Sequence, residues 1–232
     1  MKILELTSVA EDAIRIEFEP SDIQAFNQQI ILWKDVLTKK LSPIVTDVVM
    51  GYRTLTIYFN PLQISHTKVT QKINDAINKS STYKTPSRLV KIPVCYDIEY
   101  GIDLEEVAAY HKLSLDNIIE KHSNSTYFVN FLGFSPGFPF LSGMSKHLAT
   151  PRMETPRRKV PAGSVAIAGD QTGIYPSSSP GGWNIIGRTN VELLTLTKKE
   201  PSLLLPGDHL QFYPISKEDF DRRKSKVEVI SK

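Results

Sequence analysis

The chain has 232 residues, of which 41% are hydrophobic, and its 28 Lys and Arg against 25 Asp and Glu leave a formal net charge of +3. This is the composition of a soluble globular protein, and so small a net charge gives no argument for nucleic-acid binding. The single cysteine, Cys95, excludes an intramolecular disulfide and a cysteine-rich zinc site, which favours a reducing compartment. With no signal peptide at the start and no apolar run of about 18 residues, we expect a cytoplasmic protein that does not bind membranes.

The first 85 residues predict a small α+β unit. Alternating apolar side chains indicate four strands, over 3–9, 13–18, 44–50 and 54–59. Two helices are expected, the first after the candidate N-cap Ser21 and the second from about Ser65. The apolar face of the first helix is formed by residues three or four positions apart, Ile23, Phe26, Ile30, Trp33 and Leu37.

The polar stretch 80–88 contains Pro86 and has no periodicity, so it is the expected linker between domains 1–85 and 86–232. After it, two helices are predicted, capped at Asp103 and Ser114. Short strand-like runs that alternate with Gly and Pro then indicate a β-barrel or sandwich. Strands are expected over 88–96, 127–132, 164–168, 183–186, 191–196 and 209–213, followed by a solvated helix or frayed end over 216–232.

Glycine and proline are concentrated between Gly133 and Gly187, which holds nine of the 12 glycines and seven of the 15 prolines. The segment 133–137, Gly-Phe-Ser-Pro-Gly, has the pattern of a hydrolase nucleophile elbow. We reject a nucleophile role for Ser135 and predict a turn residue, because the next residue, Pro136, has no N–H to donate to an oxyanion. There is no Walker or dinucleotide-binding motif, and the five histidines form no close pair, so a protein-only metal site has little support.

The segment 145–159 carries five Lys and Arg against one acidic residue. Its Arg152 and Arg157 suit carboxylates or phosphates, because a guanidinium donates two parallel hydrogen bonds, and the prolines between them fix the backbone. A solvated basic loop is the alternative. An RNA-binding surface, with nearby phenylalanines stacking on bases, is also conceivable, but no nucleic-acid module is recognisable.

Six blocks in one order match a known family: 127–141, 148–152, 155–157, 160–169, 171–176 and 179–189. In them the chain resembles the B subunit of bacterial 5-oxoprolinase, the KipI-type sensor-kinase inhibitors and allophanate hydrolase subunit 1, a module that recurs in urea carboxylase. The resemblance implies an α+β protein in which a ferredoxin-like α/β sandwich over 1–85 precedes a cyclophilin-like β-barrel over 86–232.

The resemblance implies the B subunit of an ATP-dependent 5-oxoprolinase, which opens the lactam of 5-oxo-L-proline to L-glutamate together with the A and C subunits. ATP is then the implied cofactor, with Mg²⁺ brought by the nucleotide rather than held in a dedicated protein site. The alternative is a KipI-type module that binds a sensor histidine kinase and inhibits its autophosphorylation without turnover. Prolyl isomerisation would rest on analogy of fold alone.

The same resemblance implies a set of functional residues. The implied catalytic residues are His122, Arg152 and Arg157, although a hydrogen-bonded structural histidine explains His122 at least as well. The implied substrate- or nucleotide-binding residues are Gly133, Phe134, Pro136, Gly137, Gln171, Tyr175, Pro180, Gly181, Gly182 and Trp183. One departure from the family pattern is Phe140, where tyrosine is usual, so no hydroxyl contact is expected there.

Overall fold

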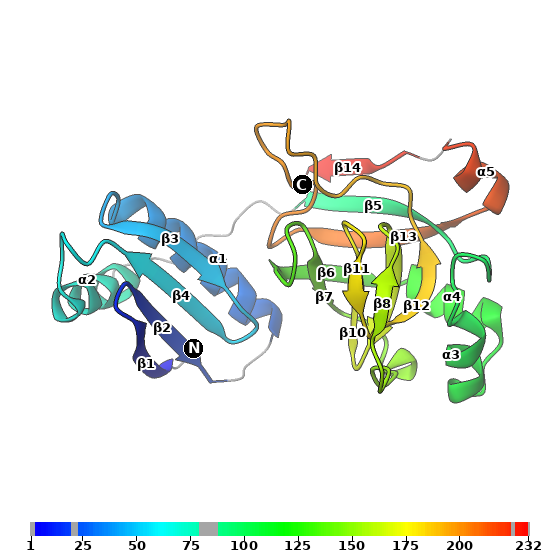
Figure 1. Ribbon diagram of the computed structural model, residues 1–232, viewed down its shortest axis with the longest axis horizontal. Helices are drawn as coiled ribbons and strands as arrows, with labels where there is room; N and C mark the ends of the chain where they lie inside the picture. Colours follow the sequence, from blue (N-terminus) through cyan, green and yellow to red (C-terminus); the bar gives the residue numbers. More distant parts are fainter. Residues whose placement is uncertain (1–2, 20–22, 79–87, 224–225, 232) are drawn as a thin grey trace. The chain divides into compact units, whose positions relative to one another are not determined.

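The computed structural model describes residues 3–19, 23–78, 88–223 and 226–231, and of 23–26 and 231 only the backbone (Figure 1). The candidate cap Ser21, the side chains of Ile23 and Phe26, and the expected linker up to residue 87 lie outside the described part. Contacts divide the chain into two compact units, Met1–Thr85 and Pro86–Lys232. Within the described ranges, no helix combines the length and apolar character needed to cross a membrane.

The first unit is a four-stranded antiparallel sheet in the order β1-β2-β4-β3 with two helices. Its elements are β1 (Ile3–Ala10), β2 (Ala13–Phe18), α1 (Ile23–Lys40), β3 (Val45–Met50), β4 (Thr54–Phe59) and α2 (His66–Asn78). The core forms where the predicted periodicities place it, because alternate strand residues such as Ile14 and Ile57 and the helical Ile30 and Ile73 are fully buried. The order β-β-α-β-β-α becomes the ferredoxin-like β-α-β-β-α-β if the first strand is moved to the end.

The second unit contains a closed barrel of seven strands in the order β12-β9-β10-β7-β6-β13-β5. The pairing of Arg188 with Cys95 joins β12 to β5 and closes the ring. The barrel strands are β5 (Arg88–Cys95), β6 (Thr126–Leu132), β7 (Pro139–Ser142), β9 (Ser164–Ala168), β10 (Gln171–Ile174), β12 (Asn184–Arg188) and β13 (His209–Ile215). Closure leaves these strands few free edges and encloses a large apolar core.

The remaining elements surround the barrel. They are α3 (Leu104–His111), α4 (Leu115–Ser123), the 3₁₀ turn η1 (Lys146–Leu148), a ribbon of β8 (Arg157–Val160) and β11 (Ser179–Gly181), α5 (Lys217–Asp221) and β14 (Glu228–Ser231). The Ser114 side chain accepts a hydrogen bond from the Asn117 N–H, which confirms the predicted cap. Asp103 stands at the N-cap position of α3, but its side chain makes no capping hydrogen bond.

Two of the expected elements differ in the structure. Residues 191–196 form no barrel strand, because their backbone bonds back onto the loop that follows: the Leu203 N–H donates to Leu193 O and the Thr195 N–H donates to Pro201 O. The tail is not simply a solvated helix, because α5 leads into β14, which pairs antiparallel with β5. Both outcomes depend on backbone pairing, which short apolar runs do not specify.

Candidate functional site

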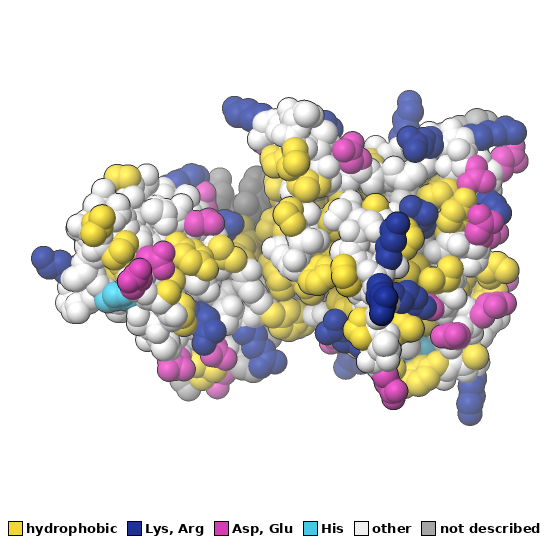
Figure 2. Space-filling model, in the orientation of Figure 1, with side chains coloured by type: hydrophobic (Ala, Val, Ile, Leu, Met, Phe, Trp, Pro, Cys, Tyr) yellow, Lys and Arg dark blue, Asp and Glu magenta, His cyan; other side chains and the backbone are white. Residues whose placement is uncertain are grey.

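The β8–β11 ribbon carries the basic segment that the sequence singles out. Arg157 pairs with Gly181, and Val160 with Ser179. Figure 2 shows Lys and Arg side chains gathered over the region of this ribbon. Arg158 and Lys159 are exposed and make no ion pair with any described residue. This part of the segment is therefore an open basic surface.

Arg157 is neutralised by a buried carboxylate. Its Nη2 lies 2.5 Å from Oδ1 of Asp103, whose side chain is only 2% exposed, whereas that of Arg157 is 24% exposed. The second oxygen of Asp103 accepts a hydrogen bond of 2.6 Å from the Ile185 N–H. One carboxylate thus joins the start of α3, the ribbon and barrel strand β12. The ion pair with Asp103 holds the Arg157 guanidinium in position, so this group is not free to bind a ligand.

Arg152 differs from Arg157 in that it is exposed and has no ion pair within the described ranges. Burial raises the pKa of the Tyr175 hydroxyl, and a backbone hydrogen bond from Trp183 and the charges of Arg152 and Arg157 oppose that rise. Both guanidiniums therefore act on the same buried phenol. Of the two, only Arg152 is free to meet an anionic ligand.

His122 is enclosed in the barrel core and has no exposed surface. The Thr172 hydroxyl donates to Ala166 O, so it accepts from His122 Nε2, 3.0 Å away, and the Tyr96 hydroxyl, 2.7 Å away, donates to Nδ1. Burial lowers the pKa of the imidazole to about 3. The ring is thus neutral at physiological pH, with both nitrogens bonded to protein.

Several implied binding residues pack against one another beneath the ribbon. Phe138 lies edge-on to Tyr175 and Trp183, with ring centroids 5.2 and 5.5 Å apart, and all three side chains are buried. Gly181 must be a glycine here, because a Cβ would lie 2.3 Å from the Tyr175 hydroxyl oxygen. These residues form an apolar cluster, and the exposed Pro180 lies in the ribbon above it.

The turn between β6 and β7 holds four more of the implied residues. Gly133, Phe134, Pro136 and Gly137 surround Ser135, whose carbonyl accepts a hydrogen bond from the Phe138 N–H, as a turn requires. Phe134 has φ of 65° although it is not glycine, and its side chain is 67% exposed. A bulky residue in the left-handed region is strained, and strain of this kind is concentrated at binding and catalytic sites.

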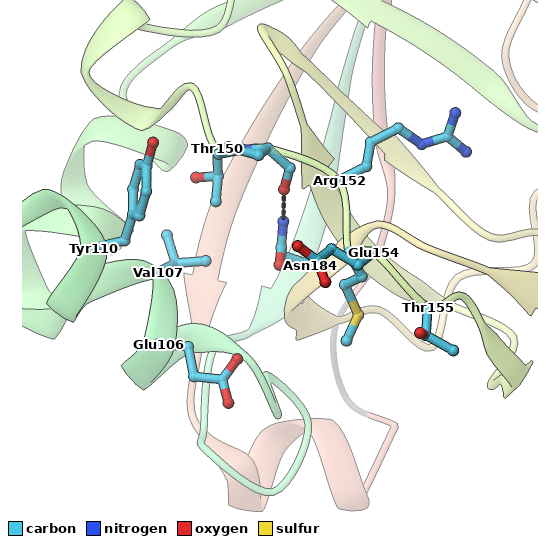
Figure 3. A pocket seen from close by; sticks show the side chains of 10 residues that line it. Glu106, Val107, Tyr110, Thr150, Arg152, Glu154, Thr155 and Asn184 are labelled. Atoms are coloured by element: carbon cyan, nitrogen blue, oxygen red, sulfur yellow. Dashed lines mark hydrogen bonds between the residues drawn. The ribbon is translucent and has the colours of Figure 1, made fainter.

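A pocket of about 440 Å³ lies between α3 and the 150–155 segment (Figure 3). Its lining residues are Glu106, Val107, Tyr110, Thr150, Pro151, Arg152, Met153, Glu154, Thr155 and Asn184. Gly182 does not line the pocket, but its carbonyl accepts a hydrogen bond of 2.9 Å from the N–H of Met153, which does. Gln171 lies at the start of β10, opposite Ala168, and does not line this pocket.

Of the implied site residues, only Arg152 lines the pocket. Sequence reasoning did not single out Asn184, Glu106 or Tyr110, which carry no recognisable motif; the one available signal is that Asn184 follows Trp183 inside a family block. No group of three or more His, Cys, Asp or Glu that could hold a metal ion is found in the part of the chain that the structure describes.

The barrel, the ribbon and the matched blocks define a class of protein. The family model of the carboxyltransferase domain, subdomain C and D, matches residues 4–204, and the chain belongs to this family. Its relatives include the B subunit of 5-oxoprolinase from Bacillus subtilis, with 51% identity over 142 residues, covering 61% of this chain and 59% of that protein. The B subunit of 5-oxoprolinase from Escherichia coli O157:H7 is 39% identical over 209 residues, covering 89% of this chain and 94% of that protein.

A solved structure shows the same fold. The crystal structure of Kluyveromyces lactis urea carboxylase matches with a TM-score of 0.78 at 17% identity, covering 99% of this chain but 25% of that one. The matched region therefore spans 59% of the Bacillus subtilis relative and a quarter of the urea carboxylase.

Proposed function

We propose that the chain is the B subunit of an ATP-dependent 5-oxoprolinase and that it acts with the A and C subunits to convert 5-oxo-L-proline to L-glutamate. The observation that carries this proposal is the similarity to the B subunit of the Escherichia coli enzyme, which extends over 89% of this chain and 94% of that protein. The pocket beside an unpaired guanidinium supports it, because the substrate carries a carboxylate.

The proposal includes the architecture and the use of ATP. We propose a circularly permuted ferredoxin-like domain over 1–85 and a cyclophilin-like barrel over 86–232. ATP, with its own Mg²⁺, would phosphorylate the lactam oxygen, and the unpaired cations Arg158 and Lys159 are suited to phosphoryl oxygens. Arg157 and His122 would position neighbouring groups, because their contacts are already made within the protein.

Reconstitution tests the proposal directly. Mixing the chain with the A and C subunits, 5-oxo-L-proline and MgATP is expected to release L-glutamate, measured by an enzyme-coupled assay. Omission of this chain should lower the rate by at least about a hundredfold, because part of the site would be missing. A full rate without this chain would refute the proposed assignment.

The strained Phe134 supports a docking role for the β6–β7 turn, and we expect it to contact the C subunit. Because asparagine tolerates positive φ, Phe134→Asn should change the free energy of unfolding by less than about 1 kcal/mol. It should weaken assembly with the C subunit at least about tenfold, measured by biolayer interferometry. Leu62→Asn is the control, since Leu62 is a 96% exposed apolar residue of the first unit.

Phe134→Asn also tests the KipI-type alternative, in which an exposed apolar residue is likewise expected to dock on the partner, here a sensor histidine kinase. In that case Phe134→Asn should leave assembly with the C subunit unchanged and relieve inhibition of a sensor histidine kinase, measured as autophosphorylation.

A further inference from the structure

Hydrogen-bond acceptors dominate the polar lining of the pocket between α3 and the 150–155 segment. Glu106 and Glu154 are exposed, and neither makes an ion pair or a side-chain hydrogen bond with a described residue. Figure 3 shows the Glu154 carboxylate next to Asn184 and the Glu106 carboxylate farther from it, on α3, whereas the Arg152 guanidinium extends away from Asn184. The pocket thus offers negative charge near Asn184 and positive charge at its rim.

Asn184 supplies a fixed acceptor that the protein does not use. The residue is 8% exposed, and its Nδ2 donates to Pro151 O at 2.9 Å and to Ile167 O at 3.3 Å. These two bonds set the orientation of the amide, so the oxygen Oδ1 remains as its acceptor. In the described part of the chain Oδ1 has no partner, and it belongs to a side chain that lines the pocket. An unpaired acceptor that is accessible from the pocket can take a donor from a ligand or from water.

The charges of the lining residues determine which kind of donor the pocket favours. Two carboxylates against one guanidinium give the pocket a net charge of −1, which disfavours a polyphosphate. An N–H group or an ammonium can donate to Asn184 Oδ1 and is favoured by the negative charge of the two carboxylates, and a carboxylate of the same ligand is favoured toward the cation at the rim. A compact α-amino acid or its lactam has this arrangement of donor and carboxylate.

We propose that this pocket holds the nitrogen of the substrate and product: the ring N–H of 5-oxo-L-proline and, after ring opening, the α-ammonium of L-glutamate. Asn184 Oδ1 accepts from the nitrogen in both states, Glu106 and Glu154 favour its charged form, and Arg152 binds the carboxylate. The assignment to this nitrogen rests on the proposed function, whereas the preference for a cationic nitrogen rests on the lining alone.

Ring opening creates a positive charge on the nitrogen, and an acidic lining stabilises that charge. The bond between the carbonyl carbon and the nitrogen breaks, water supplies a hydroxyl to the carbon and a proton to the nitrogen, and the new carboxylic acid gives its proton to the amine. The nitrogen thereby changes from a neutral amide to an ammonium. Two carboxylates near it stabilise the product-like charge more than the neutral lactam, so they promote departure of the nitrogen.

The test compares product with substrate in the complete complex with the A and C subunits. The double variant Glu106→Gln/Glu154→Gln should raise the inhibition constant of L-glutamate at least about tenfold while the KM for 5-oxo-L-proline changes less than about threefold, because only the product nitrogen is charged. The matched control is Glu105→Gln, in the same turn of α3 but outside the pocket lining, which should change neither. Arg152→Gln should raise the KM for 5-oxo-L-proline about 10- to 100-fold. Lys146→Gln removes an exposed cation of the same basic segment outside the pocket lining and should not change it.

Binding of analogues separates failure of this proposal from failure of the proposed function. Calorimetry on the full chain should show L-glutamate binding at least about tenfold more tightly than glutarate, which lacks the ammonium, and the double variant should abolish that preference. An active complex without this preference would overturn the pocket assignment and leave the enzyme intact. A changed Mg²⁺ dependence or ATP KM in the double variant would also overturn it, by placing the metal of the nucleotide on these carboxylates. An inactive complex that keeps the preference would refute only the enzymatic role.

Discussion

Replacement of Asp103 by alanine is expected to lower the free energy of unfolding of the second unit by about 3 kcal/mol. The change leaves Arg157 without its counter-ion and the Ile185 N–H without its acceptor, in a place where the lost carboxylate was 2% exposed. Because the guanidinium is 24% exposed and water can solvate it in part, we place the effect at the lower end for a broken buried pair. Urea unfolding followed by Trp183 fluorescence in a Trp33→Phe background measures the second unit alone, since the chain has two tryptophans.

Glu105→Ala is the matched control for Asp103→Ala. It removes an exposed carboxylate from the first turn of the same helix and should change the free energy of unfolding by less than about 0.5 kcal/mol. The double variant Asp103→Ala/Arg157→Leu should recover part of the loss, because no unpaired charge remains. Additive losses in the two single variants and the double variant would contradict an ion pair that couples α3 to the ribbon.

The stability of the second unit is expected to fall as the pH falls below about 6.5, and His122 should account for much of the slope. In the folded protein burial lowers the pKa of this imidazole to about 3, whereas in the unfolded chain it takes up a proton near its usual 6.5. Between these values unfolding binds a proton, so acid favours the unfolded state, and above pH 6.5 the effect vanishes. At pH 4.5 the contribution is about 3 kcal/mol, since each pH unit below the unfolded pKa adds roughly 1.4 kcal/mol.

The measurement for His122 is the free energy of unfolding as a function of pH in wild type and in His122→Gln. The variant will be less stable at neutral pH, because Tyr96 and Thr172 lose a partner, but the informative quantity is its shallower acid slope. His147→Gln removes an exposed imidazole from the same unit and controls for the loss of one histidine. An NMR titration that gave His122 a pKa near 6.5 would contradict the buried, neutral ring and would reopen an acid–base role.

Local patterns were enough to predict most of the fold. The spacing of Ile30, Trp33 and Leu37 and the alternation of Ile14, Ile16 and Phe18 each specify one buried face, and the structure buries all six. The short strands β7, β8, β10 and β11 escaped prediction because three or four residues carry too little periodicity. In addition, β8 and β11 pair with each other and not with a neighbour in the chain. The expectation of a barrel strand at 191–196 was wrong because the backbone of this segment bonds to the loop that follows it.

The candidate site was less predictable than the fold. Composition reveals that 145–159 is basic, but it cannot reveal that Asp103, more than fifty residues away, neutralises Arg157 and leaves Arg152 unpaired. An isolated aspartate before a helix is most simply a cap, and here the tertiary ion pair replaced the capping bond. The sequence does not show what Asn184 does, because an asparagine becomes an oriented acceptor only when two carbonyls fix its amide.

The first and last described strands of the second unit, β5 and β14, pair with each other. Arg88, at the start of β5, pairs with Ser231, near the end of β14, so the polypeptide enters and leaves the barrel unit at neighbouring points. A module with adjacent ends can be inserted into a longer polypeptide without opening the barrel or stretching the connections. The geometry thus makes the second unit suited to insertion between other segments of a polypeptide. The whole chain matches one quarter of the urea carboxylase in fold.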